Sequence, residues 1–154
     1  MSGFTRHRRS KHLIATFSGF EADLLRSLAA QLVELRRNEE AASEFRRFTE
    51  GSLRDGKAAG AATIIDALED AGLPAELGED KVVIDVELEP DAARVWLKTF
   101  TDLRLALATR LGVEEGDGGY WHSLPDDDPR AQAHEIYEWV GYLQETLVQA
   151  MTTR

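Results

Sequence analysis

The chain of 154 residues contains no cysteine. This absence excludes disulfide bonds, thiolate nucleophiles and the zinc or iron–sulfur sites that use cysteine ligands, and it favours a cytoplasmic protein. No apolar run approaches the roughly 20 residues that a helix needs to span a bilayer, which excludes a transmembrane helix. The N-terminal segment, residues 1–12, has basic residues but no apolar stretch after them, so it is not a secretory signal.

Catalytic and cofactor motifs are also missing from the sequence. No serine or threonine lies in a nucleophile elbow, and no glycine-rich phosphate loop follows a predicted strand. His134-Glu135 lacks the second histidine of the H-E-x-x-H zinc motif. The acidic run at 126–128 lacks the ligand alternation and the glycine of an EF-hand loop. We therefore expect no cofactor and no metal, and the sequence favours a non-enzymatic protein.

The net charge of −10 is distributed unevenly along the chain. Residues 1–60 contain 11 Lys and Arg against 8 Asp and Glu, whereas residues 61–154 contain 7 against 20. The acidic part argues against nucleic-acid binding over the whole surface. The positive end could contact phosphate or the opposite end of a second copy, but a solvated acidic surface is the simpler interpretation.

Hydropathy patterns predict a single domain over residues 1–154, of the α+β class and mainly α. We expect about four to five helices packed on a small antiparallel sheet of two or three strands. The expected elements are a β-hairpin at 3–17, helical segments at 18–36, 39–72, 90–112 and 129–151, a strand at 81–88 and an acidic, glycine-rich loop at 113–128. A strand leads into a long helix twice, at 12–36 and 82–112, so the two strands could pair in one sheet.

Two local signals refine this outline. Ser18 and Glu21 have the S-x-x-E spacing of a capping box, which predicts the start of a helix. Glycines interrupt the segment 39–72, and each costs up to about 1 kcal/mol in a helix relative to alanine. We expect a break or kink near Gly56. The alternative is that Gly56 and Gly60 allow another helix to approach closely.

Arg104 is a charge at a position where a core leucine would be expected. At 100° per residue, one arc of the helix 90–112 contains Trp96, Leu97, Phe100, Leu103, Leu107 and Leu111, and Arg104 lies inside that arc. A buried guanidinium without a partner costs on the order of several kcal/mol, so the fold must supply an acceptor or a polar cleft. Gln144 has the matching position in the apolar arc of the last helix, and Glu50 and Glu21 are carboxylate alternatives.

This pattern has two interpretations. One is an anion or ligand pocket lined by Arg104, Gln144 and Arg110, with Glu50 as a further candidate. The other is a structural polar contact that fixes the register of two helices. We favour the structural interpretation, because the pattern places no nucleophile, base or metal ligand beside the pair.

Other residues form a candidate interaction surface: Tyr120, Trp121, Arg46, Arg47, Arg6 and Arg8. The two aromatic residues lie in the glycine-rich loop, where they either cover a neighbouring helix or anchor a partner. The arginines belong either to an exposed, ion-paired helix with a basic N-terminal hairpin or to a phosphate-binding face.

Four segments of the chain resemble an actinobacterial family known as domain of unknown function 2017. They are FSGFEADLLRSLAAQLVEL from Phe17, EFRRFTEGSLRDGKAA from Glu44, WLKTFTDLRLALATRLGV from Trp96 and YEWVGYLQETLVQAM from Tyr137. Members of this family are commonly encoded near a Clp-protease adaptor, so the resemblance implies a regulatory or proteostasis setting without a mechanism. They usually have a longer, loop-rich segment where Arg37 meets Asn38 here. The resemblance therefore implies either that this protein is shortened there or that a loop is absent from the sequence, and in the second case the join is not helical.

We therefore expect a non-enzymatic cytoplasmic interaction or regulatory protein that has a protein partner and forms a homodimer. A small-molecule or anion-binding domain around Arg104 and Gln144, with or without enzymatic activity, is one alternative. A nucleic-acid-binding regulator that uses the basic N-terminal part is the other, although the overall acidity makes nucleic acid a disfavoured partner.

Overall fold

A computed structural model of the chain describes residues 3–7, 9–42, 51–75 and 83–152, with side chains outside 36–42 and 51–58. In these ranges the elements are β1 (Phe4–Arg6), β2 (Leu13–Ser18), α1 (Gly19–Ala42), α2 (Gly51–Asp70), β3 (Val83–Leu88), α3 (Pro90–Leu111), α4 (Gly118–Ser123) and α5 (Pro129–Thr152). The predicted class, a mainly helical α+β fold with a small antiparallel sheet, is confirmed.

The three strands form one antiparallel sheet in the order β1-β2-β3. Alternate residues of β2 and β3 are buried, and the pairing of Ala15 with Val86 and of Phe17 with Ile84 places them on one face. This register confirms that the strands of the two strand–helix units pair with each other. The apolar face of the sheet therefore faces the helices.

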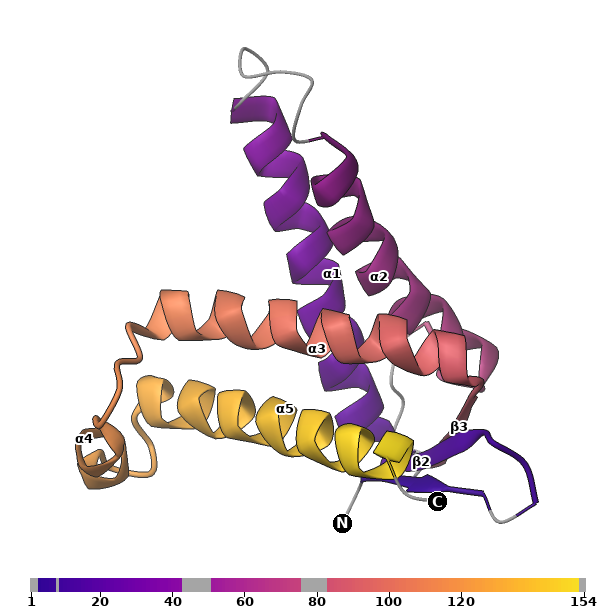
Figure 1. Cartoon of the computed structure of the whole chain (residues 1–154). Coiled ribbons are helices and arrows are strands. Elements are labelled where there is room, and N and C mark those ends of the chain that lie inside the picture. The colour runs from indigo at the N-terminus through magenta and orange to yellow at the C-terminus, as the bar shows by residue number, and fades with distance from the viewer. Residues whose placement is uncertain (1–2, 8, 43–50, 76–82, 153–154) are drawn as a thin grey trace.

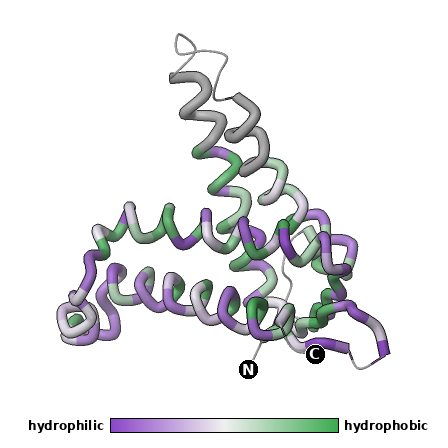
Figure 2. Tube along the Cα trace, in the orientation of Figure 1, coloured by the Kyte–Doolittle hydropathy of each residue, from purple (hydrophilic) through white to green (hydrophobic). Residues whose placement is uncertain are grey.

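The helices pack as two pairs (Figure 1). Helices α1 and α2 lie side by side, and α3 and α5 form the second pair, which crosses the first near the sheet. Green apolar segments recur along the helices of both pairs (Figure 2). The core where the pairs and the sheet meet contains an aromatic cluster in which the Phe4 ring lies 6.1 Å from Trp96 and 6.2 Å from Phe17.

The start of α1 follows the predicted capping box. The Ser18 hydroxyl accepts a bond of 3.1 Å from the Glu21 backbone N–H, and the Glu21 carboxylate accepts one of 2.9 Å from the Ser18 N–H. Glu21 is therefore unavailable as the partner of Arg104. The end of α1 differs from the prediction, because the helix extends beyond residue 36 to Ala42.

The alternative in which the join between Arg37 and Asn38 is not helical is wrong. Helix α1 runs through it, and the residues on both sides are mainly Leu, Arg, Glu and Ala, which have high helix propensity. The predicted helical segment 39–72 is also corrected, since residues 39–42 belong to α1 and α2 spans Gly51–Asp70. Residues 43–50 lie outside the described ranges.

The predicted break near Gly56 is wrong as well, because α2 is continuous from Gly51 to Asp70. At Gly60 the alternative prediction is confirmed. A Cβ at Gly60 would lie 2.5 Å from the Thr99 hydroxyl oxygen of α3, so the missing side chain allows α2 and α3 to approach closely. This tertiary packing offsets the low helix propensity of glycine.

The segment 113–128 is more ordered than the predicted loop. It contains the short helix α4 at the far end of the α3–α5 pair (Figure 1). The Asp117 carboxylate accepts hydrogen bonds from the Glu114 backbone N–H at 2.7 Å and from the Trp121 indole N–H at 2.8 Å. These bonds close the turn before α4. The glycine and aspartate content of the segment, from which a loop is predicted, does not reveal them.

Candidate functional site

Arg104 and Gln144 are in contact, as predicted. Arg104 lies on α3, and its Nη1 donates a hydrogen bond of 3.0 Å to the Gln144 Oε1 on α5. The Gln144 Nε2 donates in turn to the Thr101 hydroxyl at 2.6 Å, so one amide links two consecutive turns of α3. An amide that satisfies both partners fixes the register of the two helices.

The rest of the Arg104 environment is supplied by α5. The guanidinium lies over the Tyr137 ring at 5.2 Å from its centroid, and Nη2 donates to the Tyr137 hydroxyl at 3.5 Å. A Cβ at Gly141 would lie 3.1 Å from the Arg104 Nε, so the glycine makes room for the guanidinium. The Arg104 Nε itself is buried without a hydrogen-bond partner among the described residues.

An open hollow of about 610 Å³ lies beside this contact. It is lined by Arg104, Tyr137, Glu138, Gly141, Tyr142, Gln144, Glu145 and Val148. The two glutamates disfavour an anion there, because they place negative charge around the single arginine of the lining. The geometry therefore favours a structural role for Arg104 and Gln144.

Arg110 does not join them. It lies near the end of α3 and donates from Nη1 to the Gln31 Oε1 on α1 at 3.3 Å. Glu50 lies outside the described residues. The predicted four-residue constellation therefore contains one contact, Arg104 with Gln144, and one residue that belongs to a different site.

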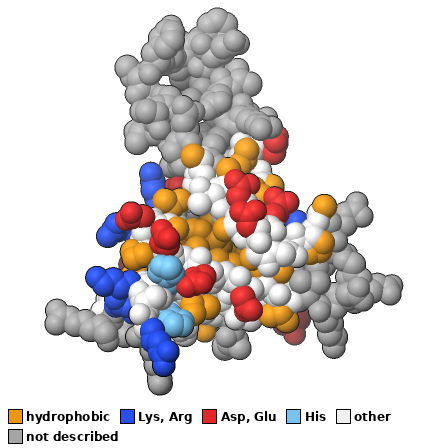
Figure 3. All heavy atoms as spheres, turned by 90° about the vertical axis from the view of Figure 1, so that its right-hand side faces the viewer, with side chains coloured by type: hydrophobic (Ala, Val, Ile, Leu, Met, Phe, Trp, Pro, Cys, Tyr) orange, Lys and Arg blue, Asp and Glu red, His pale blue; other side chains and the backbone are white. Residues whose placement is uncertain are grey.

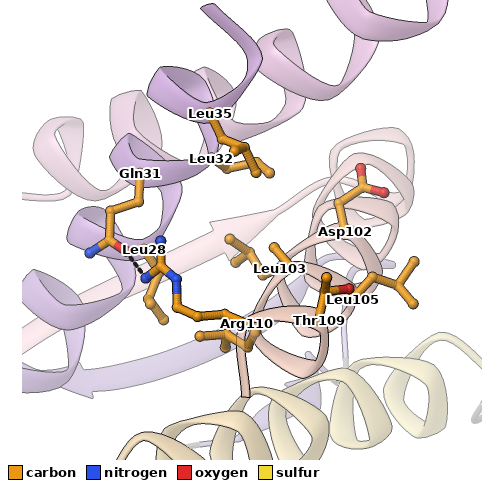
Figure 4. Close-up of a pocket in the computed structure, with 11 residues that line it drawn as sticks. Leu28, Gln31, Leu32, Leu35, Asp102, Leu103, Leu105, Thr109 and Arg110 are labelled. Carbon is orange, nitrogen blue, oxygen red and sulfur yellow. Dashed lines mark hydrogen bonds between the residues drawn. The ribbon is translucent and has the colours of Figure 1, made fainter. Parts of the chain in front are cut away.

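That different site is an apolar groove between α1 and α3, which we call the α1/α3 groove (Figure 4). It has a volume of about 540 Å³ and is lined by Leu28, Gln31, Leu32 and Leu35 from α1 and by Asp102, Leu103, Leu105, Ala106, Leu107, Thr109 and Arg110 from α3. Leu32 and Leu35 of α1 and Leu103 of α3 point toward one another, Leu105 lies on the side of α3 turned away from α1, and Arg110 with Gln31 bounds the space on one side (Figure 4). A volume of this size is within the range of ligand-binding clefts.

The groove exists because the two helix pairs cross. Helix α1 is covered near the sheet, where Leu25 and Leu28 are buried, but Leu35, about two turns further along, is 41% exposed. On α3, Leu103 is buried, Leu107 is half-buried and Leu105 is 59% exposed. The apolar stripe of α1 thus continues past the point where the helices cover each other, and α3 adds an exposed leucine outside its own stripe.

The leucine spacing in the sequence carries part of the signal for this site. Leu35 continues the i, i+4, i+7 spacing of Leu28 and Leu32 in α1, which are buried, yet it is 41% exposed. Leu105 lies outside the apolar arc of α3, and a large apolar side chain off the arc indicates a second, exposed apolar surface.

Of the two candidate aromatic residues, Trp121 covers a neighbouring helix and Tyr120 is exposed. The Trp121 ring is buried and stacks on the His134 ring of α5, with centroids 4.7 Å apart and planes inclined by 7°. Tyr120 is 49% exposed, and its hydroxyl accepts a hydrogen bond of 2.8 Å from Arg130. Trp121 therefore holds α4 on α5, and only Tyr120 of the pair offers an exposed aromatic surface.

The electrostatics of this end centre on Asp117. Its carboxylate accepts the Glu114 backbone N–H and the Trp121 indole N–H, and these bonds hold the pKa of Asp117 below its ordinary value of 3.8. The ionised form is the one that the turn needs.

The basic candidates fall mainly outside the described side chains. Arg8, Arg46 and Arg47 are not described, and Arg6 lies in β1 with an interaction of its own. On the face of the molecule that carries the hairpin, Lys and Arg side chains lie along one side, beside a surface rich in Asp and Glu (Figure 3). Of the four candidate arginines the structure describes Arg6, which lies in β1 and not in α4 with Tyr120 and Trp121.

Comparison with known proteins identifies the family. The model of the domain of unknown function DUF2017 matches residues 35–151, which is more than half of the chain. The chain belongs to the DUF2017 family. The DUF2017 match includes all of α2, α3 and α4, and α5 up to Met151, and it contains both the Arg104–Gln144 contact and the α3 wall of the groove. Of the four segments that resemble the family, the one at residues 17–35 lies almost wholly before the matched region.

No curated protein and no solved structure matches this DUF2017 chain. Within the described ranges, no helix combines the length and the apolar character needed to cross a membrane. The same ranges contain no cluster of three or more His, Asp or Glu side chains suited to a metal ion.

Proposed function

We propose that this DUF2017 protein is a non-enzymatic cytoplasmic interaction protein that binds an apolar segment of a partner in the α1/α3 groove. One observation supports the proposal above the others: Leu35 and Leu105 are exposed by 41% and 59% on opposite walls of a groove lined mainly by apolar side chains. Exposed apolar side chains that line a concave site favour occupation by an apolar ligand, because burial of the ligand and of the site removes apolar surface from water.

The alternative of an anion pocket at Arg104 and Gln144 has less support. Gln144 already accepts from the guanidinium, and Glu138 and Glu145 surround the adjacent hollow. The nucleic-acid alternative relies on basic residues of which Arg8, Arg46 and Arg47 lie outside the described side chains. The α1/α3 groove therefore carries the proposal.

Two finer parts of the proposal come from outside the groove. The resemblance implies a setting in Clp-type proteostasis, which would make a Clp adaptor or its substrate the first partner to examine. We also propose a homodimer, which light scattering on the purified chain tests directly by its mass.

A matched pair of variants tests the groove. Leu105→Arg places a charge on the α3 wall at an exposed position, and Val148→Arg makes the same kind of change on α5, outside the groove. We expect a partner identified by co-purification and mass spectrometry to be lost with Leu105→Arg and retained with Val148→Arg. Equal recovery with both variants, at unchanged helical circular dichroism, would contradict the proposal.

A further inference from the structure

The α1/α3 groove combines an apolar floor with one cation whose partner among the described residues is neutral. Arg110 donates to the Gln31 amide oxygen at 3.3 Å, and both side chains are exposed. Asp102, the acidic residue of the lining, is already engaged in an interaction of its own. Arg110 is therefore the charged group of the groove that a negatively charged group of a ligand can pair with.

The hydrogen-bond donors at this end converge. An arginine guanidinium has five N–H donors, and one of them is used by Gln31. Because the Gln31 oxygen accepts that bond, its amide N–H₂ group is left as a donor beside the guanidinium. A carboxylate is the group that accepts from both, and a bond between ionised groups is stronger than a neutral one.

The dimensions of the groove fit a short helix. Its α3 wall from Leu103 to Arg110 contains eight residues, and the seven steps between them span about 10 Å at 1.5 Å per step, which is roughly two helical turns. On the α1 wall Leu28, Leu32 and Leu35 follow i, i+4, i+7 spacing, which forms a ridge along one side. A ridged groove between two helices is a form that accommodates the apolar face of an amphipathic helix.

We propose that the α1/α3 groove binds an amphipathic helix of a partner protein whose leucine-like face carries a Glu or Asp directed at Arg110 and Gln31. This inference rests on the proposed function and specifies the partner. The apolar face supplies the burial, and the acidic residue sets the direction of the helix by pairing at the Arg110 end. The net charge of −10 is screened beyond about 8 Å at physiological salt, so the local cation decides the contact.

Selection from a phage-displayed library of 16-residue peptides against the full chain tests the inference. We expect enriched peptides with apolar residues at i, i+3 or i+4, and i+7 and a Glu or Asp at one fixed position relative to them. The affinity of an enriched peptide is then measured by fluorescence anisotropy. Arg110→Gln should weaken it about two- to five-fold, the range of an exposed ion pair, and Arg94→Gln, a matched change on α3 outside the groove, should leave it unchanged.

A charge exchange gives the sharpest readout. Arg110→Glu should weaken the selected peptide and should prefer the same peptide with its acidic residue replaced by Lys. Enriched apolar peptides without a fixed acidic position, or with an affinity that Arg110→Gln does not change, would overturn this inference. If binding of those peptides is still lost with Leu105→Arg, the proposed function stands. No enrichment, or binding insensitive to Leu105→Arg, would overturn both.

Two other occupants are also distinguished. A dimer that dissociates with Leu105→Arg but not with Val148→Arg would show that a second copy fills the groove. Stabilisation by oleate in a thermal-shift assay, lost with Leu105→Arg and without peptide enrichment, would show a lipid ligand. Either result overturns the helix.

Discussion

Replacing Gln144 by Leu should destabilise the protein more than replacing Arg104 by Met. The Gln144→Leu change removes the acceptor of the Arg104 Nη1 at 3.0 Å and the donor to Thr101 at 2.6 Å. The guanidinium then keeps one long bond of 3.5 Å to Tyr137. Leaving a buried charged donor without its acceptor costs about 1–3 kcal/mol, and we expect the lower half of this range because Arg104 is half-buried.

The Arg104→Met change acts differently because it removes the donor and its desolvation together. It loses a charge-assisted hydrogen bond and the contact with the Tyr137 ring, but it also removes the Nε that is buried without a partner. These terms oppose each other, so the free energy of unfolding should stay within about 1 kcal/mol of the wild-type value. The double variant should be no less stable than Gln144→Leu alone.

Urea unfolding followed by circular dichroism measures all four free energies at constant m. A structural contact predicts a favourable coupling of about 1 kcal/mol between the two residues in the double-mutant cycle. The reasoning is refuted if Arg104→Met costs more than Gln144→Leu, or if the two effects simply add.

Three further perturbations test the packing and the electrostatics. Gly60→Ala should lower the free energy of unfolding in urea by about 1–2 kcal/mol, because the overpacking against Thr99 exceeds the helix-propensity gain of about 1 kcal/mol. Adding Thr99→Ala to the same chain should reverse most of that loss. If the effects of the two substitutions simply add, the close approach of the helices is contradicted. Ser18→Ala should cost about 1 kcal/mol in the same assay through loss of the N-cap of α1, and an unchanged unfolding midpoint would contradict the capping role. The pKa of Asp117 lies below 3.8 in the folded state, so the stabilisation from its ionised carboxylate is present above pH 3.8 and is lost as pH falls through the lower, folded value. The NMR resonance of the Trp121 indole N–H should shift in that acidic range in the wild type. The same shift in Asp117→Asn would refute the assignment.

The sheet and the helix contact could be predicted because each depends on a short-range pattern. Alternation in β2 and β3 determines which residues face the core, and a one-residue shift would expose all of them. Arg104 and Gln144 each interrupt an apolar arc, so a polar contact between their helices follows once the arcs pack together. Both signals are periodic and lie within single elements.

The groove could not be predicted, because it depends on where two helix pairs cross. Leu35 has the same spacing as the buried leucines of α1, and nothing in that spacing shows that the elements packed over the apolar stripe of α1 end before Leu35. Arg110 and Gln31 are separated by 79 positions in the sequence, and neither interrupts an apolar arc. The continuous course of α2 past Gly56 could not be predicted for a related reason, because helix packing on another element, as between Gly60 and Thr99, is not visible in a local glycine count.

The most direct test of the account is leucine-methyl NMR of the full chain with a selected helical peptide at saturation. Binding in the α1/α3 groove predicts large shifts for the methyl groups of Leu35 and Leu105, on opposite walls, and small ones for Leu143 and Leu147 in the core of α5. The same peptide should cause no shifts in Leu105→Arg. Unchanged Leu35 and Leu105 methyl groups at saturation would contradict the central claim.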